Sequence, residues 1–207
     1  MAANPDEYKS TVGLDSLYVA QVTNDSASAY AVNTPEYLAP AAEASWEPNS
    51  SMDTQYADDQ AYDVSVSEGE TKISLKVTAV PIELLSRMTG RVYDSNAGRM
   101  YDNAGTPPYF ALSFRSLKSN GSYRYYQFLK VMFSMPKEEM TTKGEKAEPK
   151  TAELTATAIK TTYKWYLNET VGVDSIKRIV GDEDATSFSG VSWFSEVQVP
   201  TATSAAT

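Results

Sequence analysis

Carboxylates are the main candidates for acid–base chemistry in this chain, because its 207 residues include no cysteine and no histidine. The sequence therefore offers no cysteine nucleophile, no zinc–thiolate site and no histidine general base. Asp58 and Asp59 form a carboxylate pair, but adjacent residues of a strand point to opposite faces, which is poor for joint work on one bond. We expect no catalytic residue and no cofactor, and predict that the protein is not an enzyme. An acid hydrolase that uses carboxylates alone is the alternative.

Asp182, Asp184 and Thr186 have the alternate spacing of a calcium-binding loop. Such a loop also needs a glycine at its sixth position and a glutamate at its twelfth. The chain has Ser187 and Trp193 there. We therefore expect a polar loop and no metal site.

Arg115, Arg124 and Lys130 lie among tyrosines, a pattern that also occurs where proteins stack nucleic-acid bases. The net charge of −9 argues against affinity for DNA. Cation–π pairing within a sheet is the simpler explanation.

Negative charge is concentrated in one third of the chain. The first 71 residues carry thirteen acidic side chains and one basic side chain, whereas the other 136 carry fourteen and seventeen. Apolar residues spaced through this part, such as Tyr62 and Val64, indicate folded structure with one sign of charge. Its densest run has no Lys or Arg and comprises Asp53, Asp58, Asp59, Asp63, Glu68 and Glu70.

The elements that must position these residues are mostly strands, because the apolar period is two. Residues 14–22 form a short predicted strand with Leu17 and Val19 on one face. Residues 72–80 alternate cleanly, and 62–66 alternate just before them. Glu68–Gly69–Glu70 between the two runs predicts a turn, so 62–80 is expected to be a hairpin with acids toward its tip. Residues 43–60 are expected to be a long, partly mobile interface loop.

One helix is predicted after Pro81. Ile82, Leu85 and Met88 recur at three-residue intervals, and Gly90 closes the segment. A helix this short is marginal alone, so we expect it to pack across an end or face of the sheet.

A second hairpin is predicted over residues 109–133, with Asn120–Gly121 as its two-residue turn. Neither face is purely polar. The pair is therefore either packed on both sides within the monomer, or has one face in the core and one against a neighbouring subunit. The turn would set these opposing pairs: Phe110 and Val131, Leu112 and Leu129, Ser113 and Phe128, Phe114 and Gln127, Arg115 and Tyr126, Leu117 and Arg124.

The C-terminal third is predicted to contain a charged loop over 136–149, a strand over 151–161 and one possible helical turn at Ile176, Ile179 and Val180. Trp193 and Phe194 are apolar enough to dock on the body. We expect one domain over residues 11–199, an N-terminal arm over 1–10 and a disordered tail over 200–207. The N-terminus has no apolar signal region and no stretch approaches the roughly 20 apolar residues of a membrane span. We therefore expect a soluble protein, made in the cytoplasm, with no membrane partner.

Several motifs, in this order, closely resemble the major tail proteins of long-tailed, non-contractile bacteriophages, specifically the phi13-type group. The resemblance covers residues 11–199. The motifs are Val12–Gly13–Leu14–Asp15 with Leu17–Tyr18–Val19–Ala20, Tyr56–Ala57–Asp58–Asp59, Pro108–Tyr109–Phe110–Ala111–Leu112, Ser119–Asn120–Gly121–Ser122–Tyr123–Arg124–Tyr125 and Thr142–Lys143–Gly144–Glu145.

This resemblance implies a mainly β fold, an antiparallel β-sandwich or small barrel with one flanking short α-helix. It implies a structural virion protein of the tail, made in the host bacterial cytoplasm, whose copies form hexameric rings stacked into a tube. The implied partners are other copies, the tape measure protein, and the tail terminator and distal tail proteins. DNA would pass through at ejection without specific binding.

Two sets of residues follow as candidate surfaces. The acidic run from Asp53 to Glu70 would form a lumen or inter-ring surface, where it repels DNA phosphates; a solvated outer face is the alternative. The long amphipathic strands would form an inter-subunit sheet through Ile73, Leu75, Val77, Arg115, Tyr126 and Phe128. A non-catalytic binding module of the carbohydrate-binding or adhesin type is the alternative function, and it would stay monomeric.

Overall fold

The computed structural model describes residues 9–57, 60–137, 151–168 and 170–200. The chain is mainly β, with antiparallel strands and one short helix, which confirms the predicted fold class. The strands are β1 (Asp15–Asp25), β2 (Tyr30–Val32), β3 (Glu36–Tyr37), β4 (Ala41–Ala57), β5 (Gln60–Val77), β6 (Val92–Asp94), β7 (Arg99–Tyr101), β8 (Tyr109–Leu117), β9 (Tyr123–Phe133), β10 (Ala152–Ala158), β11 (Trp165–Asn168), β12 (Gly172–Asp174) and β13 (Arg178–Asp182), and the helix is α1 (Ile82–Thr89).

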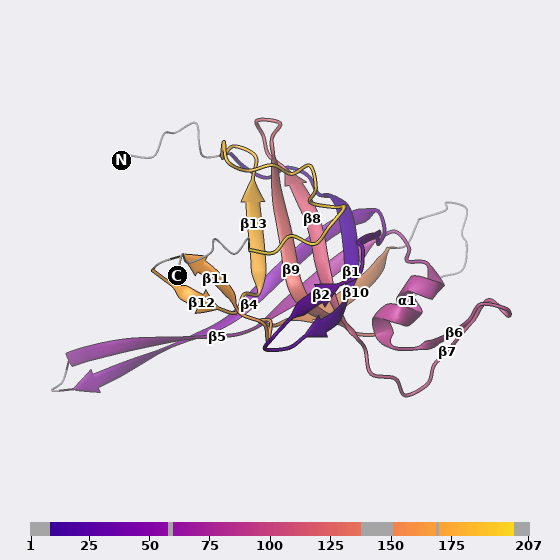
Figure 1. Ribbon diagram of the computed structural model, residues 1–207, viewed down its shortest axis with the longest axis horizontal. Helices are drawn as coiled ribbons and strands as arrows, with labels where there is room; N and C mark the ends of the chain where they lie inside the picture. Colours follow the sequence, from indigo (N-terminus) through magenta and orange to yellow (C-terminus); the bar gives the residue numbers. More distant parts are fainter. Residues whose placement is uncertain (1–8, 58–59, 138–150, 169, 201–207) are drawn as a thin grey trace, which may run out of the picture.

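The main sheet has the order β2-β1-β8-β9-β10-β5-β4, and β3 and β13 pair with β1 and β9 beside this path. Two small hairpins, β6–β7 and β11–β12, lie outside it. Among the described strands β4 ends the order and forms no ladder with β1, so the sheet is not a closed barrel. A long projection formed by β4 and β5 lies at one end of the molecule, with α1 and the β6–β7 hairpin at the other (Figure 1).

The core lies between the two halves of the curved sheet. Leu17 and Val19 of β1 are buried, as predicted, and so are Ile73, Leu75 and Val77 of β5. Trp46 of β4 reaches across to β8 and β9, with its ring centroid 5.7 Å from that of Phe114 and 5.0 Å from that of Tyr126. Each large apolar side chain buried in this way contributes about 1.5–3 kcal/mol. Because both halves contribute side chains to one core, the arrangement is that of a sandwich.

The helix α1 is confirmed at one end of this core. Pro81 occupies its N-cap position, and Gly90 ends it in the left-handed conformation with φ 69°. Leu84, Leu85 and Met88 are buried against the sheet. The glycine is required for a second reason, because a Cβ at position 90 would lie 2.4 Å from the Thr106 carbonyl oxygen.

The predicted hairpin over 62–80 is wrong, because β5 runs without a turn from Gln60 to Val77. Its partner is β4, which occupies most of the predicted interface loop over 43–60. Gly69 and Pro48 were signals of a bulge rather than of a turn: the β4–β5 register shifts between Pro48 and Ser50, opposite Gly69. Proline and glycine are tolerated in strands at such irregularities.

The β8–β9 hairpin is confirmed, but its predicted register is wrong by one residue near the turn. Gly121 N–H donates to the Lys118 carbonyl (3.0 Å) and Lys118 N–H to the Ser122 carbonyl (2.8 Å), so the loop has three residues. Only Gly121 takes a positive φ, 87°, because the Asn120 side chain accepts a hydrogen bond from Ser122 N–H instead. A bulge then restores Phe110 opposite Val131. The observed pairs nearer the turn are Leu112 and Phe128, Ser113 and Gln127, Phe114 and Tyr126, Arg115 and Tyr125, Leu117 and Tyr123.

Both faces of the β8–β9 hairpin are covered within the monomer. The face away from the core carries buried Ser113, Tyr125 and Gln127. Gln127 exchanges hydrogen bonds with the backbone of Gln198, and the Tyr125 ring packs 5.4 Å from Trp193. The predicted docking of the C-terminal aromatic residues is therefore confirmed. Within the monomer this segment occupies much of that face, and its contact with a neighbouring subunit stays a prediction.

Three other predictions concern the C-terminal third. The strand over 151–161 is confirmed as β10, whose Leu154, Ala156 and Ala158 are buried. The helical turn at Ile176, Ile179 and Val180 is wrong, because residues from Arg178 form β13 against β9. Most of the charged loop over 136–149 and the tail over 201–207 lie outside the described residues.

Candidate assembly surface

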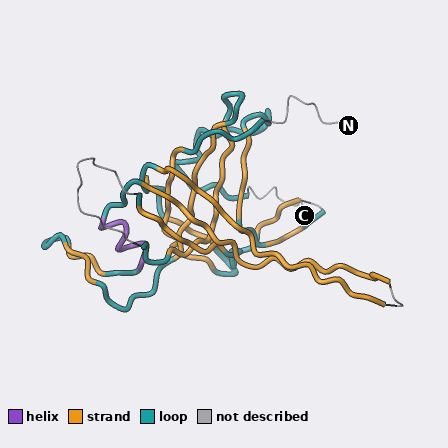
Figure 2. Tube along the Cα trace, turned by 180° about the vertical axis from the view of Figure 1, so that it is seen from behind, coloured by secondary structure: helices purple, strands orange, loops and turns teal. Residues whose placement is uncertain are grey.

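The outer part of the β4–β5 hairpin, residues 50–57 and 60–68, forms a two-stranded ribbon that leaves the body of the protein; we call it the arm (Figures 1 and 2). Seen from behind, it extends well past the rest of the sheet (Figure 2). The described residues provide no second layer over it. An isolated two-stranded ribbon is at best marginally stable in water, so the arm is the part of the fold that most needs a partner.

One face of the arm is apolar. Met52 pairs with Val66 and Thr54 with Val64, so their side chains share a face with Tyr62. These side chains are exposed: Met52 by 71%, Tyr62 by 80%, Val64 by 52% and Val66 by 59%. Single exposed apolar residues are ordinary, but a contiguous row on one face marks an interaction surface.

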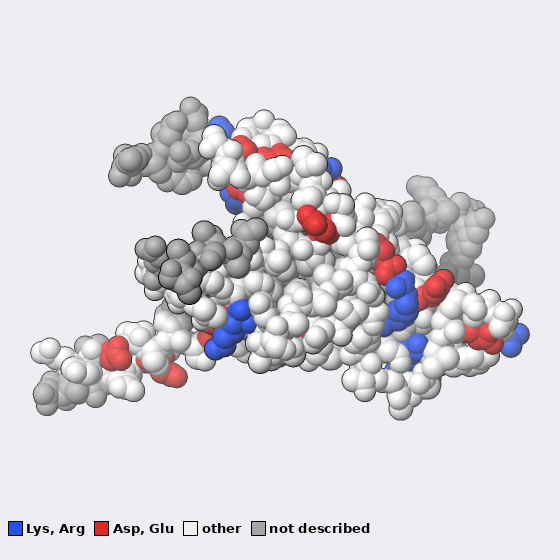
Figure 3. All heavy atoms as spheres, in the orientation of Figure 1, with Lys and Arg blue, Asp and Glu red and all other residues white. Residues whose placement is uncertain are grey.

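The opposite face of the arm is polar and acidic. Asp53 lies opposite Ser65, and Asp63 lies opposite Gln55. Both carboxylates are exposed, and residues 49–70 include no Lys or Arg. Nearer the body, Glu68 and Glu70 are also exposed, and Glu68, opposite Ser50, lies on the same face as Val66. Asp58 and Asp59 lie outside the described residues. Acidic side chains are visible along the arm in the space-filling view (Figure 3).

A basic hollow of about 380 Å³ lies where the arm joins the body; we call it the root hollow. Lys177 Nζ donates to the Gly69 carbonyl (2.7 Å) and to Thr71 Oγ1 (3.1 Å). The Arg178 guanidinium lies 5.8 Å from the Trp46 ring centroid. Basic side chains gather at this junction (Figure 3). The hollow is lined by Pro48, Asn49, Ser50, Glu68, Thr71, Phe128, Lys160, Ser175, Ile176, Lys177 and Arg178.

The cations of the root hollow differ from most others in the protein. Within the described ranges Lys160, Lys177 and Arg178 form no ion pair with a carboxylate. Several cations elsewhere have carboxylate partners, such as Lys76 with Glu43 at 2.6 Å and Arg87 with Glu36 at 2.7 Å. The root hollow therefore holds three cations against one lining acid, Glu68, and keeps an excess of positive charge.

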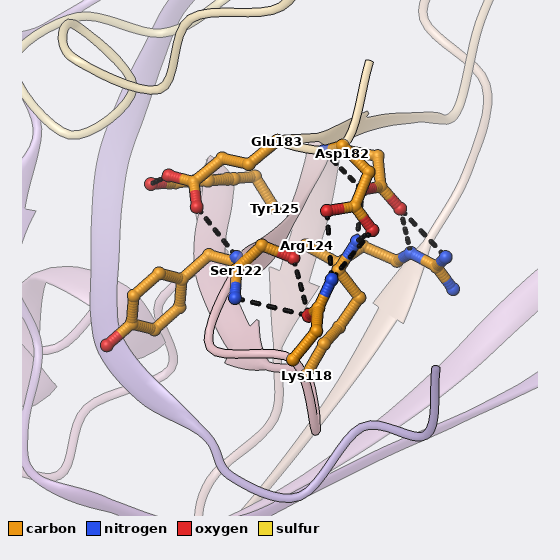
Figure 4. Close-up of polar contacts among 9 residues, drawn as sticks. Lys118, Ser122, Arg124, Tyr125, Asp182 and Glu183 are labelled. Carbon is orange, nitrogen blue, oxygen red and sulfur yellow. Dashed lines mark hydrogen bonds and ion pairs between the residues drawn. The ribbon is translucent and has the colours of Figure 1, made fainter. Parts of the chain in front are cut away.

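A polar network at the other end of β9 fixes the β8–β9 turn to the segment after β13 (Figure 4). Lys118, whose side chain is 1% exposed, donates to Asp182 Oδ1 and Asp184 Oδ2. Arg124 Nε donates to Asp182 Oδ2 at 2.8 Å, and Tyr125 OH to Glu183 Oε1 at 2.7 Å. Burial alone raises the pKa of Asp182, but hydrogen bonds from Lys118, the Asp184 N–H and Arg124 lower it to about 2.

This network accounts for the calcium-like spacing of Asp182 and Asp184, whose carboxylates hold an ammonium group. Lys118 was not a candidate in the sequence, because it lies 64 positions from Asp182 and has no local pattern. In the described part of the chain no group of three His, Cys, Asp or Glu residues is arranged to hold a metal ion. No helix among those residues has the length and apolar character to span a membrane.

The cation–π prediction is confirmed for two of its three residues. The Arg115 guanidinium lies 4.1 Å from the centroid of the Tyr123 ring, and Lys130 Nζ lies 4.8 Å from that of Tyr109. Lys130 also pairs with Asp25 at 2.5 Å in a buried position. Arg124 instead pairs with Asp182. These three cations thus interact with rings and carboxylates of their own chain.

The residues predicted for an inter-subunit sheet lie mainly inside the monomer. Ile73, Leu75, Val77 and Phe128 are buried in the core. Tyr126 is half-buried, with its ring stacked on Phe114 at 5.3 Å, and Arg115 is half-buried beside Asp15. Their side chains therefore support the sheet from within. A sheet that continues into another subunit would have to use a backbone edge such as that of β4.

Comparison with known proteins agrees with this architecture. No curated protein matches the chain. The family model described as phage tail tube protein matches residues 49–200, nearly three quarters of the chain. The match begins next to the arm and includes the helix, the β8–β9 hairpin and the C-terminal segment that covers it. The chain therefore belongs to the phage tail tube protein family.

Proposed function

We propose that this protein is a tail tube subunit whose copies form hexameric rings, and that these rings stack into the tube of a long, non-contractile tail. The tube encloses the tape measure protein during assembly and meets the tail terminator and distal tail proteins at its ends. DNA passes through it at ejection without specific binding. The subunits are made in the host bacterial cytoplasm. Membership of the tail tube family supports this proposal.

The observation that carries it is the uncovered apolar face of the arm. Burying a fully exposed side chain of this kind is worth about 1.5–3 kcal/mol, and Met52, Tyr62, Val64 and Val66, at 52–80% exposed, would gain a large part of that each. Association costs about 4–15 kcal/mol in lost translation and rotation. For a single arm contact, the free energy gained by burial is therefore close to the cost of association. In a closed ring each subunit is held by more than one contact, so the later contacts form at a high effective concentration. This balance favours cooperative assembly over isolated dimers.

The acidic side chains fit a conduit for DNA. A cation that contacts a phosphate releases counterions and adds a favourable term, which would accumulate along a tube. Asp53, Asp63, Glu68 and Glu70, with Asp58 and Asp59, are proposed to form a lumen or inter-ring surface that avoids such binding. For the inter-subunit sheet, the terminal strand β4 supplies the backbone edge, with Ile73, Leu75 and Val77 supporting it from the core.

The test is negative-stain microscopy and sedimentation of purified protein at high concentration. The wild type should form tubes or rings with a central hole. Val66→Asp places a charge on the apolar face of the arm and should abolish them. Val191→Asp makes the same change at a valine outside the arm that is 95% exposed, and should leave them intact. A monomer at all concentrations that binds glycans would instead support the alternative of a binding module.

A further inference from the structure

An acidic group lies on the β4–β5 hairpin, and a basic group lies beside its base, on segments before and within β13 and after β10. Asp53 lies opposite Ser65, so Asp63 is its diagonal neighbour on the polar face of the arm. No Lys or Arg lies between residues 49 and 70 to offset them. At the base of the hairpin, the root hollow brings together three cations, Lys160, Lys177 and Arg178, with a single acidic residue, Glu68.

The root hollow retains free hydrogen-bonding capacity. Lys177 uses two of the three donors of its ammonium group, on Gly69 and Thr71. The Arg178 guanidinium lies near the Trp46 and Phe128 rings, and no hydrogen bond to a described residue occupies its donors. A planar guanidinium with free donors matches the geometry of a carboxylate. The hollow is thus suited to acidic side chains.

These two groups of charges cannot meet within one chain. Gly69, which Lys177 contacts, is six residues from Asp63 along an extended strand. At about 3.3 Å per residue, that separation is roughly 20 Å. The strand pairing holds the arm straight over this distance (Figure 2). Ion pairs between these two groups therefore need the arm of one molecule and the root hollow of another.

We propose that the polar face of the arm, through Asp53 and Asp63, docks in the root hollow of a second copy, against Lys160, Lys177 and Arg178. This inference rests on the proposed function, since it names the contact by which the subunits assemble; it uses Asp53 and Asp63 for that contact and not for the lumen. The two surfaces are different, so the contact is head-to-tail and propagates into a ring or a filament. Charge pairing sets the register of the contact, and the apolar face of the arm supplies burial.

Charge reversal tests the pairing directly. One variant reverses the arm (Asp53→Lys with Asp63→Lys), and another reverses the root hollow (Lys160→Glu with Arg178→Glu). All four side chains are exposed, and circular dichroism and thermal unfolding check that each variant folds. Each variant alone should lose at least tenfold in sedimentable tubes. An equal mixture of the two should co-assemble, because each arm then meets a root hollow of opposite charge, and the fourfold variant should assemble by itself.

The control variant, Arg99→Glu with Lys164→Glu, reverses two exposed cations outside the root hollow and should assemble normally. If wild-type tubes form but the mixture and the fourfold variant fail to regain them, the docking proposal is overturned while the proposed function stands. Loss of tubes in the control alone would place the contact elsewhere and also overturn it. Absence of any assembly by the wild type would reject the proposed function itself.

Discussion

Lys118 carries a charge that is almost completely removed from water, with its side chain 1% exposed between Asp182 and Asp184. Lys118→Met should keep most of the apolar stem but leave both carboxylates without their shared cation. Charge-assisted hydrogen bonds are worth about 1.5–3 kcal/mol each, and partial exposure of the acids reduces this. We expect a loss of about 2 kcal/mol in the free energy of unfolding in urea. Lys164→Met, at an exposed cation, should change little, and equal losses would contradict the role of Lys118.

The same network gives a pH dependence with a defined sign. Hydrogen bonds from Lys118 and Arg124 outweigh burial and lower the pKa of Asp182 to about 2 in the folded state, below the unfolded value of about 3.9. Its stabilising contribution is therefore complete above the unfolded pKa and is lost as pH falls through the folded one. The free energy of unfolding should fall between roughly pH 5 and pH 2. Asp182→Asn should flatten this decline, measured by urea titration at each pH; an unchanged slope would exclude Asp182 as its source.

The sequence exposed only part of this chemistry. Asp182 and Asp184 could be selected by their spacing, and the rejection of a calcium loop followed from Ser187 and Trp193. Lys118 could not be selected, because its partners come from a distant strand that the chain order does not reveal. The root hollow could not be predicted from the sequence for the same reason. Lys160, Lys177 and Arg178 come together with Pro48 and Glu68 only when β13 pairs with β9.

At the scale of elements, Gly90 combines a helix ending with a close backbone approach. Gly90→Ala should lower the free energy of unfolding for two reasons. The left-handed conformation costs about 1 kcal/mol, and the new Cβ clashes with the Thr106 carbonyl. Gly98 also has a positive φ, 62°, but open space around its missing side chain. Gly98→Ala should therefore show the conformational cost alone. Thermal unfolding of both variants compares them, and equal losses would mean that residue 106 moves aside at no cost.

Elements with a strong apolar period could be predicted, and irregular ones could not. Each of the strands around Leu17 and Leu75 and the helix after Pro81 is buried on one side. That burial gives the sequence a regular apolar period, which predicts the element. Glu68–Gly69–Glu70 has turn-like composition, yet it lies within β5 because a bulge at Pro48 accommodates it. In β8–β9, Asn120–Gly121 indicated the hairpin correctly, but the side chain of Asn120 determined a loop one residue longer and with it the register.

The two parts of the β4–β5 hairpin should differ in protection from hydrogen exchange. Ala41–Pro48 pairs with β5 beneath the packed Trp46 ring, whereas 50–57 belongs to the arm. In the monomer we expect slow exchange in the first part and fast exchange in the second, because a ribbon without a second layer opens easily. Tubes should protect both parts. Equal protection of 50–57 in monomer and tube would show that assembly does not involve the arm.

At the scale of the whole molecule, the arm is separable from the core. Replacing residues 50–68 by Asn-Gly would join the two strands by a short turn and remove no side chain of the hydrophobic core. The shortened protein should keep a thermal midpoint within a few degrees of the wild type, because its core is intact. It should also remain monomeric in sedimentation velocity. Tube formation by the shortened protein would assign assembly to the body.

The arm also has a mechanical consequence. It is one ribbon thick and spans roughly 25 Å over eight residue pairs, whereas the body is a two-layered sandwich with a packed interior. Resistance to bending rises steeply with thickness, so the ribbon yields long before the body does. A tail whose subunits are joined through such ribbons would curve at its joints while each bore segment stays round. Flexibility of the tail and constancy of its channel would then belong to different parts of the same chain.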